Sequence, residues 1–186
     1  MPLLEIVTRH MLSRPQSLQR NQASIDALQG ADWVQTILVD AVGRGVPWAN
    51  RQLAVYAPQV EGDYVWILDD DDMCIYPKLV TDVNRIVKQH APDLIMLRAD
   101  CGSRHGILPS DAQWGQPPRL YRISMSSFIV RRAVWQAHAD AFPADLAGDY
   151  AFISAVYAAT PPDKIYWHDV VVMRISRQSH GRAEDA

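Results

Sequence analysis

Cysteine is scarce in this sequence. Cys74 and Cys101 are the two among 186 residues, and they form no spaced metal-binding motif. We expect reduced thiols of a cytoplasmic protein, although the sequence leaves one disulfide open. No apolar run reaches the roughly 20 residues that cross a bilayer. The first five residues include no basic segment before a long apolar run, so we expect neither a signal peptide nor a membrane span.

An excess of positive charge is absent as well. Lys and Arg number 18 against 21 Asp and Glu, which gives a formal charge of −3. Nucleic-acid binding depends on clustered basic side chains, so this balance argues against a dedicated nucleic-acid binder. The hydrophobic fraction of 48% is ordinary for a globular protein. The length is sufficient for one domain with a sizeable core.

The chain alternates segments of strand and helix character, which predicts an α/β fold with a mostly parallel central sheet. The expected strands are residues 3–8, 34–39, 64–68, 93–97, 123–130, 165–167 and 170–175. The expected helices cover residues 15–30, 48–57 and 132–138, and two more begin at Pro77 and Asp149. Residues 102–118 are rich in Gly, Pro and Ser and are predicted to form a long surface loop. We expect one domain over residues 1–178 and a polar tail over residues 179–186.

The most specific feature is a run of four aspartates, Asp69 to Asp72, directly after an apolar strand. Four adjacent carboxylates repel one another, and a divalent cation that prefers hard oxygen ligands would offset this repulsion. In an extended chain, residues two apart point the same way, so Asp69 and Asp71 are expected to converge while Asp70 and Asp72 face elsewhere. The run also falls where open α/β sheets bind ligands, outside the carboxyl ends of strands. The alternative is a solvated acidic turn.

The segment from Val65 to Asp72, followed by Pro77 and an amphipathic helix, resembles the Asp-x-Asp segment of GT-A glycosyltransferases, family two above all. The resemblance extends from Glu5 to about His180. It implies a single-domain GT-A-like α/β/α sandwich. It also implies a nucleoside-diphosphate sugar as donor, a hydroxyl group as acceptor, and Mn²⁺ or Mg²⁺ as cofactor.

Other segments resemble further motifs of that family. Residues 6–9 look like its first nucleotide-binding unit, and Asp40 is similar to the aspartate that contacts the nucleoside. Residues 45–51 resemble its Gly-x-x-x-Ala-Arg-Asn stretch, and Asp149 resembles the late acidic residue that acts as base in inverting members. The predicted site is therefore Asp149 as catalytic base; Thr8, Arg9, Asp40, Arg51, Asp69 and Asp70 for the donor; and Asp69, Asp71 and His180 for the metal.

The sequence departs from the family pattern in its late metal-binding motif. Ser176 stands where the family has a histidine, so His180 or His168 would be the third metal ligand. Several of the candidates also have structural interpretations. Asp149 is a favoured helix cap, and Asp40 is a common turn residue. Trp114 would stack on a sugar face or be an isolated exposed aromatic residue.

Two other functions remain open. A nucleotidyltransferase that makes the sugar nucleotide has a similar fold, but it uses a glycine-rich first loop, and residues 8–15 contain no glycine. A non-catalytic module for nucleotide or glycan recognition is supported by Ser176 in the late motif. Donor hydrolysis measured with and without metal distinguishes an enzyme from such a module.

Overall fold

The apolar segments form a central sheet in this computed structural model, which describes residues 1–142 and 148–175. Within these residues the sheet has eight strands, in the order β2-β1-β3-β7-β5-β8-β4, with β6 beside β5. The strands are β1 (Leu4–Met11), β2 (Trp33–Asp40), β3 (Tyr64–Ile67), β4 (Met73–Cys74), β5 (Leu94–Asp100), β6 (Ile107–Leu108), β7 (Phe128–Arg131) and β8 (Ile165–Arg174). The predicted boundary after residue 178 lies outside the described residues.

Most strands of the sheet run in the same direction, as the sequence predicted. β1 is parallel to both β2 and β3, and β5 is parallel to β8. β7 lies antiparallel between β3 and β5, which sets β5 and β8 in the direction of β1. The carboxyl ends of β1, β2 and β3 therefore meet at one edge of the sheet.

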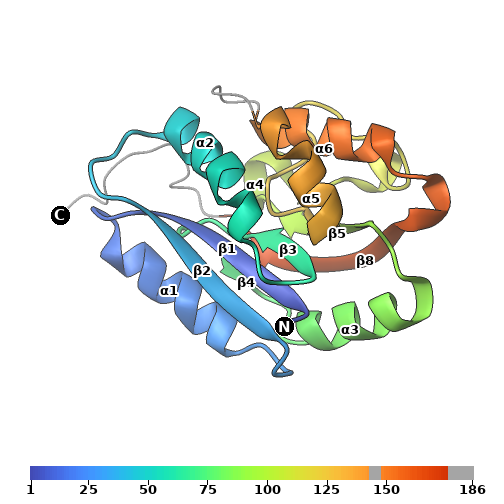
Figure 1. The fold of residues 1–186 in the computed structure, drawn as a ribbon, viewed down its shortest axis with the longest axis horizontal. Coiled ribbons are helices and arrows are strands. Elements are labelled where there is room, and N and C mark those ends of the chain that lie inside the picture. Colours follow the sequence, from blue (N-terminus) through green and yellow to red (C-terminus); the bar gives the residue numbers. More distant parts are fainter. Residues whose placement is uncertain (143–147, 176–186) are drawn as a thin grey trace.

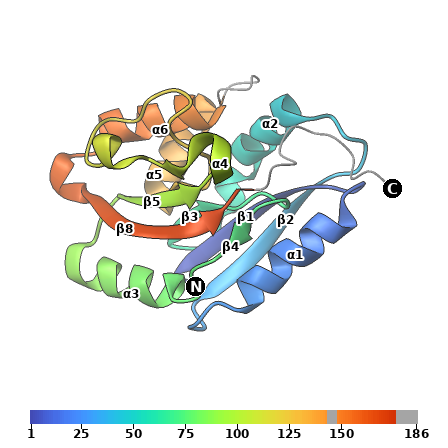
Figure 2. The ribbon, with the colours of Figure 1, turned by 180° about the vertical axis from the view of Figure 1, so that it is seen from behind.

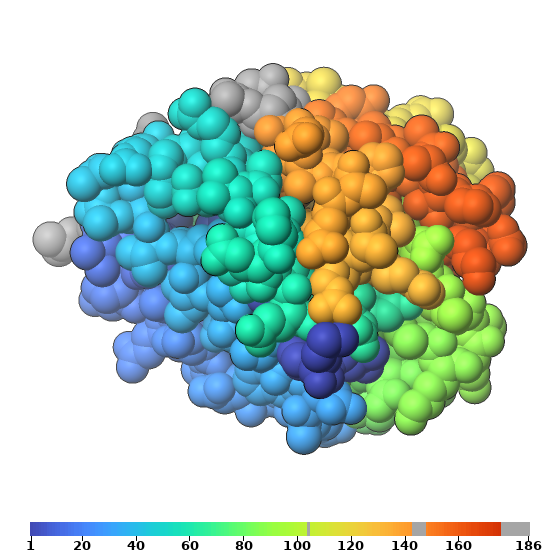
Figure 3. Space-filling view, in the orientation of Figure 1, coloured from blue at the N-terminus to red at the C-terminus, as the bar shows by residue number. Residues whose placement is uncertain are grey.

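Helices cover both faces of the sheet and complete the predicted three-layer sandwich (Figure 1). The helices are α1 (Pro15–Asp26), α2 (Val46–Tyr56), α3 (Leu79–His90), α4 (Gly102–His105), α5 (Arg132–His138) and α6 (Gly148–Ala159). α1 and α3 cover one face, and α2, α5 and α6 cover the other (Figures 1 and 2). In the space-filling view, α2 and α5 lie side by side on one outer face (Figure 3). None of the helices in the described ranges is long and apolar enough to cross a membrane.

β3 shows why the sequence of a central strand is apolar without alternation. Trp66 packs into the core on the side of α1 and α3, whereas its neighbours Val65 and Ile67 pack into the core on the side of α2, α5 and α6. Successive side chains of a strand point to opposite faces, and helices cover both faces here. β3 therefore needs apolar residues at every position.

A buried carboxylate holds the amino end of β1. Glu5 is 1% exposed and accepts hydrogen bonds from the hydroxyls of Thr36 and Tyr56 and from the N–H groups of Glu61 and Gly62. Burial alone would raise the pKa of Glu5, but these hydrogen bonds together hold the pKa below its usual value. A Cβ on Gly62 would lie 2.6 Å from the Glu5 Cβ, so the close approach requires glycine.

Three predicted elements differ from the structure. The strand predicted from Ile123 begins only at Phe128, because the chain turns where Ser127 N–H donates to the Ser124 carbonyl. The loop predicted over residues 102–118 contains α4, β6 and a 3₁₀ turn, Asp111–Gln113. The two strands predicted after residue 164 are one strand, β8, and the register between β5 and β8 shifts near Arg98.

The cysteines agree with the sequence analysis. Both are free thiols, and Cys74 is buried in the core beneath α1 and α3. Burial raises the pKa of each thiol to about 11. Neither thiol is therefore activated as a nucleophile.

Candidate functional site

A cavity of about 610 Å³ opens at the carboxyl ends of β1 and β2, beside α2. One part of its wall is apolar and the other is charged. The apolar part comprises Met11, Leu38, Val46, Trp48 and Ala49, and the charged part comprises Arg9, His10, Arg14, Asp40, Asp69 and Asp71. Such a wall suits a ligand with an apolar aromatic end and an anionic end.

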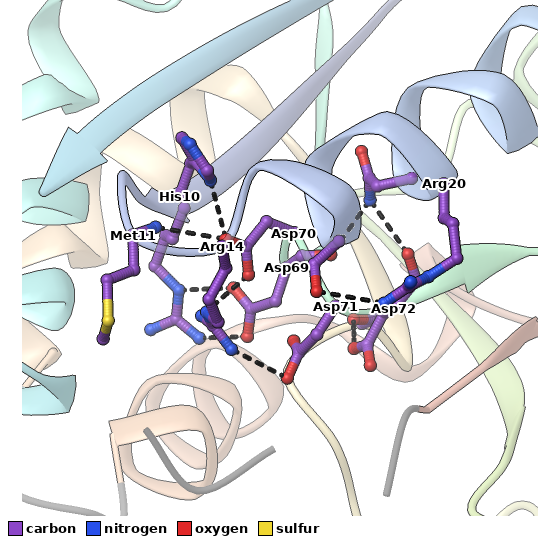
Figure 4. Close-up of polar contacts among 12 residues, drawn as sticks. His10, Met11, Arg14, Arg20, Asp69, Asp70, Asp71 and Asp72 are labelled. Atoms are coloured by element: carbon purple, nitrogen blue, oxygen red, sulfur yellow. Dashed lines mark hydrogen bonds and ion pairs between the residues drawn. The ribbon is translucent and has the colours of Figure 1, made fainter. Parts of the chain in front are cut away.

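The four aspartates form a tight turn after β3 (Figure 4). Asp72 N–H donates to the Asp69 carbonyl at 2.9 Å, so the chain reverses instead of staying extended. The assumption of an extended chain is therefore wrong. Even so, Asp69 and Asp71 line the same cavity, whereas Asp70 is fully buried behind it.

Arg9 holds Asp69 in a forked ion pair. Its Nε donates to Asp69 Oδ1 at 2.6 Å, and its Nη2 donates to Asp69 Oδ2 at 2.5 Å. The remaining nitrogen, Nη1, donates to Asn50 Oδ1 at 2.7 Å, which ties the pair to α2. Burial alone would lower the pKa of Arg9, but the charge of Asp69 outweighs it and raises the pKa.

Asp70 is held by two hydrogen bonds from the end of β1 and by an ion pair with Arg14, the residue before α1. His10 Nδ1 lies 2.7 Å from Asp70 Oδ2, and Met11 N–H donates to the same oxygen at 3.1 Å. Arg14 Nη2 lies 2.7 Å from Asp70 Oδ1 (Figure 4). Burial nevertheless keeps the pKa of Asp70 above its usual value. Asp70 does not line the cavity, so its contacts are with the protein.

Asp71 is a largely buried carboxylate close to other negative charges. Its side chain is 5% exposed, and Arg14 Nη1 lies 3.1 Å from its Oδ2. Burial, followed by the negative charge of Asp69, raises the pKa of Asp71 to about 6. An additional cation between Asp69 and Asp71 would relieve this repulsion.

Asp40 shapes the loop that leads into α2. Its carboxylate accepts hydrogen bonds from the N–H groups of Val42, Gly43 and Arg44, and it also lines the cavity. Gly45 then adopts a φ of 77°, a conformation that favours glycine, and α2 begins at the next residue. The sequence offered a turn residue and a nucleoside contact as alternatives for Asp40, and the turn contacts are present.

Asp149 lies in the first turn of α6, near Arg9. A Cβ on Gly148 would lie 2.2 Å from Asn50 Nδ2, so the start of α6 packs directly on the side chain that binds Arg9. Burial raises the pKa of Asp149, the positive charge of Arg9 lowers it, and the charge of Asp69 raises it again. Asp149 is thus within electrostatic reach of the Arg9–Asp69 pair, although it does not line the cavity.

The remaining sequence candidates lie away from this cavity or outside the described residues. Thr8 is buried in the sheet, where its hydroxyl accepts a hydrogen bond from Gln35. Arg51 is exposed on α2 and does not line the cavity. His168 is buried beside α3, with Nε2 3.4 Å from Asp82 Oδ2, and burial lowers its pKa. His180 lies outside the described residues.

Trp114 is half-buried, not exposed as the sequence suggested. Its ring lies 4.9 Å from the ring of Trp167, and the guanidinium of Arg98 stacks 4.3 Å from its centroid. Arg98 also forms ion pairs with Asp111 and Asp169. These contacts fasten residues 102–118 to β5 and β8, so Trp114 has a structural explanation.

Sequence reasoning missed His10, Arg14, Trp48 and Asn50. Each contacts or lines the site. Trp48 and Asn50 lie in the motif-like segment 45–51, from which Arg51 was selected instead, whereas His10 and Arg14 belong to no motif that the sequence analysis identified. Arg14 pairs with carboxylates about 57 residues away, and no short-range pattern reports such a contact. For His10 and Arg14, the one available signal was their place in the sequence, after the predicted first strand and before Pro15.

The carboxylates of the turn fit a divalent cation that arrives with a phosphate ligand. Within residues 1–142 and 148–175, no group of three or more His, Cys, Asp or Glu side chains is placed to hold a metal ion by itself. Mg²⁺, however, commonly binds one or two carboxylates and completes its shell with water and substrate phosphates. Asp69 and Asp71 supply two such carboxylates on one cavity wall.

Neither a family model nor a curated protein matches this sequence. Solved structures do match it. One is Staphylococcus aureus TarS 1–349 in complex with UDP-GlcNAc, which is 15% identical, has a TM-score of 0.70, and matches over 97% of this chain and 60% of that chain. A second is the mannosyltransferase PcManGT from Pyrobaculum calidifontis in complex with GDP-Man and Mn²⁺, at 13% identity and a TM-score of 0.62, over 96% of this chain and 58% of that one.

A third similar structure is CMP:2-keto-3-deoxy-manno-octonic acid synthetase complexed with CTP. It is 15% identical, with a TM-score of 0.54, over 91% of this chain and 90% of that one. Identities this low show the fold alone. The chain has the GT-A-like fold of nucleotide-sugar transferases, which confirms the fold inferred from the acidic run. It spans about 60% of the TarS fragment and 58% of the mannosyltransferase.

Proposed function

We propose that this chain is a glycosyltransferase that moves a sugar from a nucleoside-diphosphate sugar to an acceptor hydroxyl. The observation that carries this proposal is the cavity with Asp69 and Asp71 on one part of its wall and Met11 and Trp48 on another. Such a wall offers a surface for a nucleobase and an electrostatic site for a metal-bound diphosphate. The nucleotide-sugar complexes of two proteins with this fold support it.

The donor would lie across both parts of the wall. Its base would pack against Trp48, because aromatic rings stack favourably on flat apolar surfaces. Its diphosphate would face the acidic turn, where Asp69 and Asp71 would hold Mn²⁺ or Mg²⁺. When bound, such a cation stabilises the negative charge that the leaving diphosphate gains. His180 stays a prediction as a further ligand.

Asp149 would act as the base of an inverting reaction. It would accept the proton of the acceptor hydroxyl, whose oxygen then attacks the anomeric carbon of the donor as the bond to the diphosphate breaks. Burial raises the pKa of Asp149, which strengthens the group as a base. The nearby Arg9 favours the charged carboxylate, so both requirements of a base are supported.

A nucleotidyltransferase is the second candidate, because a CMP-sugar synthetase has the same fold over 90% of its length. Two features favour the glycosyltransferase. The segment after β1 has no glycine to cradle a triphosphate. In addition, Arg14 and its carboxylate partners occupy the cavity wall beside this segment. Donor cleavage therefore fits this site better than donor synthesis.

The test is a panel of nucleotide sugars examined by thermal shift with Mn²⁺, followed by donor hydrolysis assays. A ligand that binds only the folded state raises the melting temperature. We expect one nucleoside series to raise it, and metal-dependent release of the nucleoside diphosphate to follow. Release of pyrophosphate from CTP and a sugar acid would instead establish the nucleotidyltransferase. Binding without any turnover would establish a non-catalytic module.

A further inference from the structure

Arg14 lies on the cavity wall between two carboxylates, one of which has more protein contacts than the other. Its Nη2 lies 2.7 Å from Asp70 Oδ1, and its Nη1 lies 3.1 Å from Asp71 Oδ2 (Figure 4). Asp70 is fully buried and is also held by His10 and Met11, so it cannot turn toward the cavity. Asp71 lines the cavity, and Arg14 is its one side-chain partner within the described part of the chain.

Arg14 and its neighbour Arg9 differ in how many of their guanidinium nitrogens have a hydrogen-bond partner. All three nitrogens of the Arg9 guanidinium donate to Asp69 or Asn50. The Nε of Arg14, in contrast, is buried without a hydrogen-bond partner among the residues that the structure describes. An arginine with an unpaired nitrogen beside a cavity is suited to phosphate oxygens, because a guanidinium can bind them in a bidentate manner.

We propose that Arg14 is a phosphate-binding residue of the donor site and that it exchanges Asp71 for the donor diphosphate. This inference rests on the proposed function. In the structure Arg14 forms an ion pair with Asp71. Asp71 would instead pair with a divalent cation when one is bound, and Nη1 of Arg14 would then be available to a phosphate oxygen.

Asp70 then acts as a positioning residue, because it keeps the guanidinium on the wall through Nη2 during the exchange. The aspartates of the run would thus have two different roles. Asp69 and Asp71 face the ligand, and Asp70 faces the arginine that accompanies it. This would explain why a fully buried carboxylate stands within the acidic turn.

The exchange predicts effects of opposite sign in Arg14→Gln. Without the competing guanidinium, Asp71 is available to the cation, so Mn²⁺ alone should bind about tenfold more tightly. Without the charged hydrogen bonds to phosphate, a nucleoside diphosphate at saturating Mn²⁺ should bind about 10- to 100-fold more weakly. A residue that merely supports the fold would weaken both.

The experiment is calorimetric titration of the wild-type chain and Arg14→Gln with Mn²⁺ alone, and then with UDP, GDP and CDP at saturating Mn²⁺. Arg85→Gln is the matched control, because Arg85 is an exposed arginine on α3 that does not line the cavity. It should leave both affinities unchanged. Arg14→Lys keeps the charge without the fork and should fall between wild type and Arg14→Gln. It also serves the comparison if circular dichroism shows Arg14→Gln to be unfolded.

Unchanged diphosphate affinity in Arg14→Gln would overturn the phosphate role while leaving the proposed function intact. Unchanged or weaker binding of Mn²⁺ alone would overturn the exchange with Asp71. If the wild-type chain binds none of the three nucleoside diphosphates, the proposed function fails, and the phosphate role of Arg14 fails with it. The titration with Mn²⁺ alone still decides in that case whether Arg14 and the cation compete for Asp71.

Discussion

Arg9 and Asp69 form a forked ion pair although 60 residues separate them in the sequence. The pair joins the carboxyl end of β1 to the turn that follows β3, and these strands are parallel neighbours in the sheet. Two parallel N–H···O bonds fix the orientation of a carboxylate as well as its position. The acidic turn is therefore presented to the cavity in one geometry before any ligand binds.

The negative charge of Asp71 is expected to lower the free energy of unfolding. We expect Asp71→Asn to raise the free energy of unfolding at pH 7.5 by about 1–3 kcal/mol, because the pKa of Asp71 is raised to about 6 in the folded state. Between pH 4 and 6 the folded state binds the proton more tightly than the unfolded chain does. The contribution of this carboxyl to stability therefore decreases as the pH rises through that window, and the variant should lack this decrease. Urea unfolding at pH 4.5 and 7.5 measures the difference.

The matched control is Asp32→Asn, because Asp32 is exposed in the turn before β2. It should change stability by less than about 0.5 kcal/mol. We also expect Asp71→Asn to lose Mn²⁺-dependent nucleotide binding. A variant less stable than wild type at pH 7.5 would show that the carboxylate stabilises the turn instead of straining it.

Asp149→Asn separates a catalytic base from a helix cap. The amide keeps the size of the side chain and can still accept the hydrogen bond of Tyr150 N–H, so stability should change little. It cannot accept the proton of the acceptor, so turnover should fall by at least about 100-fold while donor binding persists. Steady-state kinetics and donor titration on the same preparation measure both. Full turnover by a folded Asn variant would reject the inverting assignment.

The contact between α6 and α2 predicts a compensating pair of substitutions. Gly148→Ala places a Cβ 2.2 Å from Asn50 Nδ2 and should destabilise the protein by about 1–3 kcal/mol. Asn50→Ala also destabilises it, because Arg9 Nη1 loses its acceptor, but it makes room for that Cβ. The double variant should lose less stability than the sum of the single losses. Strict additivity in urea unfolding would mean that α6 moves aside without strain.

The pH dependence of turnover gives an independent test of Asp149. A base must be deprotonated, and burial raises the pKa of Asp149 above that of an ordinary aspartate. The acid limb of the kcat profile should therefore lie above about pH 3.9, the usual aspartate value. Since Arg9 lowers the pKa of Asp149, Arg9→Gln should move the acid limb to higher pH. An acid limb at the same pH in both proteins would assign it to another group.

Local sequence patterns were sufficient to predict an α/β fold with a mostly parallel sheet and the position of the acidic turn, whereas the layered sandwich was implied by the family resemblance. β3 is apolar throughout because both faces are covered, and the aspartates follow it because a parallel strand ends at the ligand-binding edge. The failure in the strand before α5 occurred where a local turn interrupts an apolar stretch. Ile123 lies in an apolar stretch, yet a serine turn delays β7 to Phe128.

The arrangement within the site was less predictable than its location. The sequence analysis assumed an extended chain and therefore expected Asp70 and Asp72 to face away from Asp69 and Asp71. In the structure, the turn and the hydrogen-bond donors of β1 determine where each carboxylate points. The pairing of Arg14 with Asp70 depends on how α1 enters after β1. No property of either residue alone encodes this pairing, so it emerges only from the tertiary structure.

Glu5 has a mechanical consequence for the whole cavity. Its hydrogen bonds pin β1, β2, α2 and the turn before β3 together at the end of the strands opposite the acidic turn. These hydrogen bonds thus join the strands to one another near their amino ends. We therefore expect this part of the sheet to move less at these amino ends than at the carboxyl ends, where the acidic turn lies. A carboxylate far from the cavity would in this way preserve the register of the strands that carry the site.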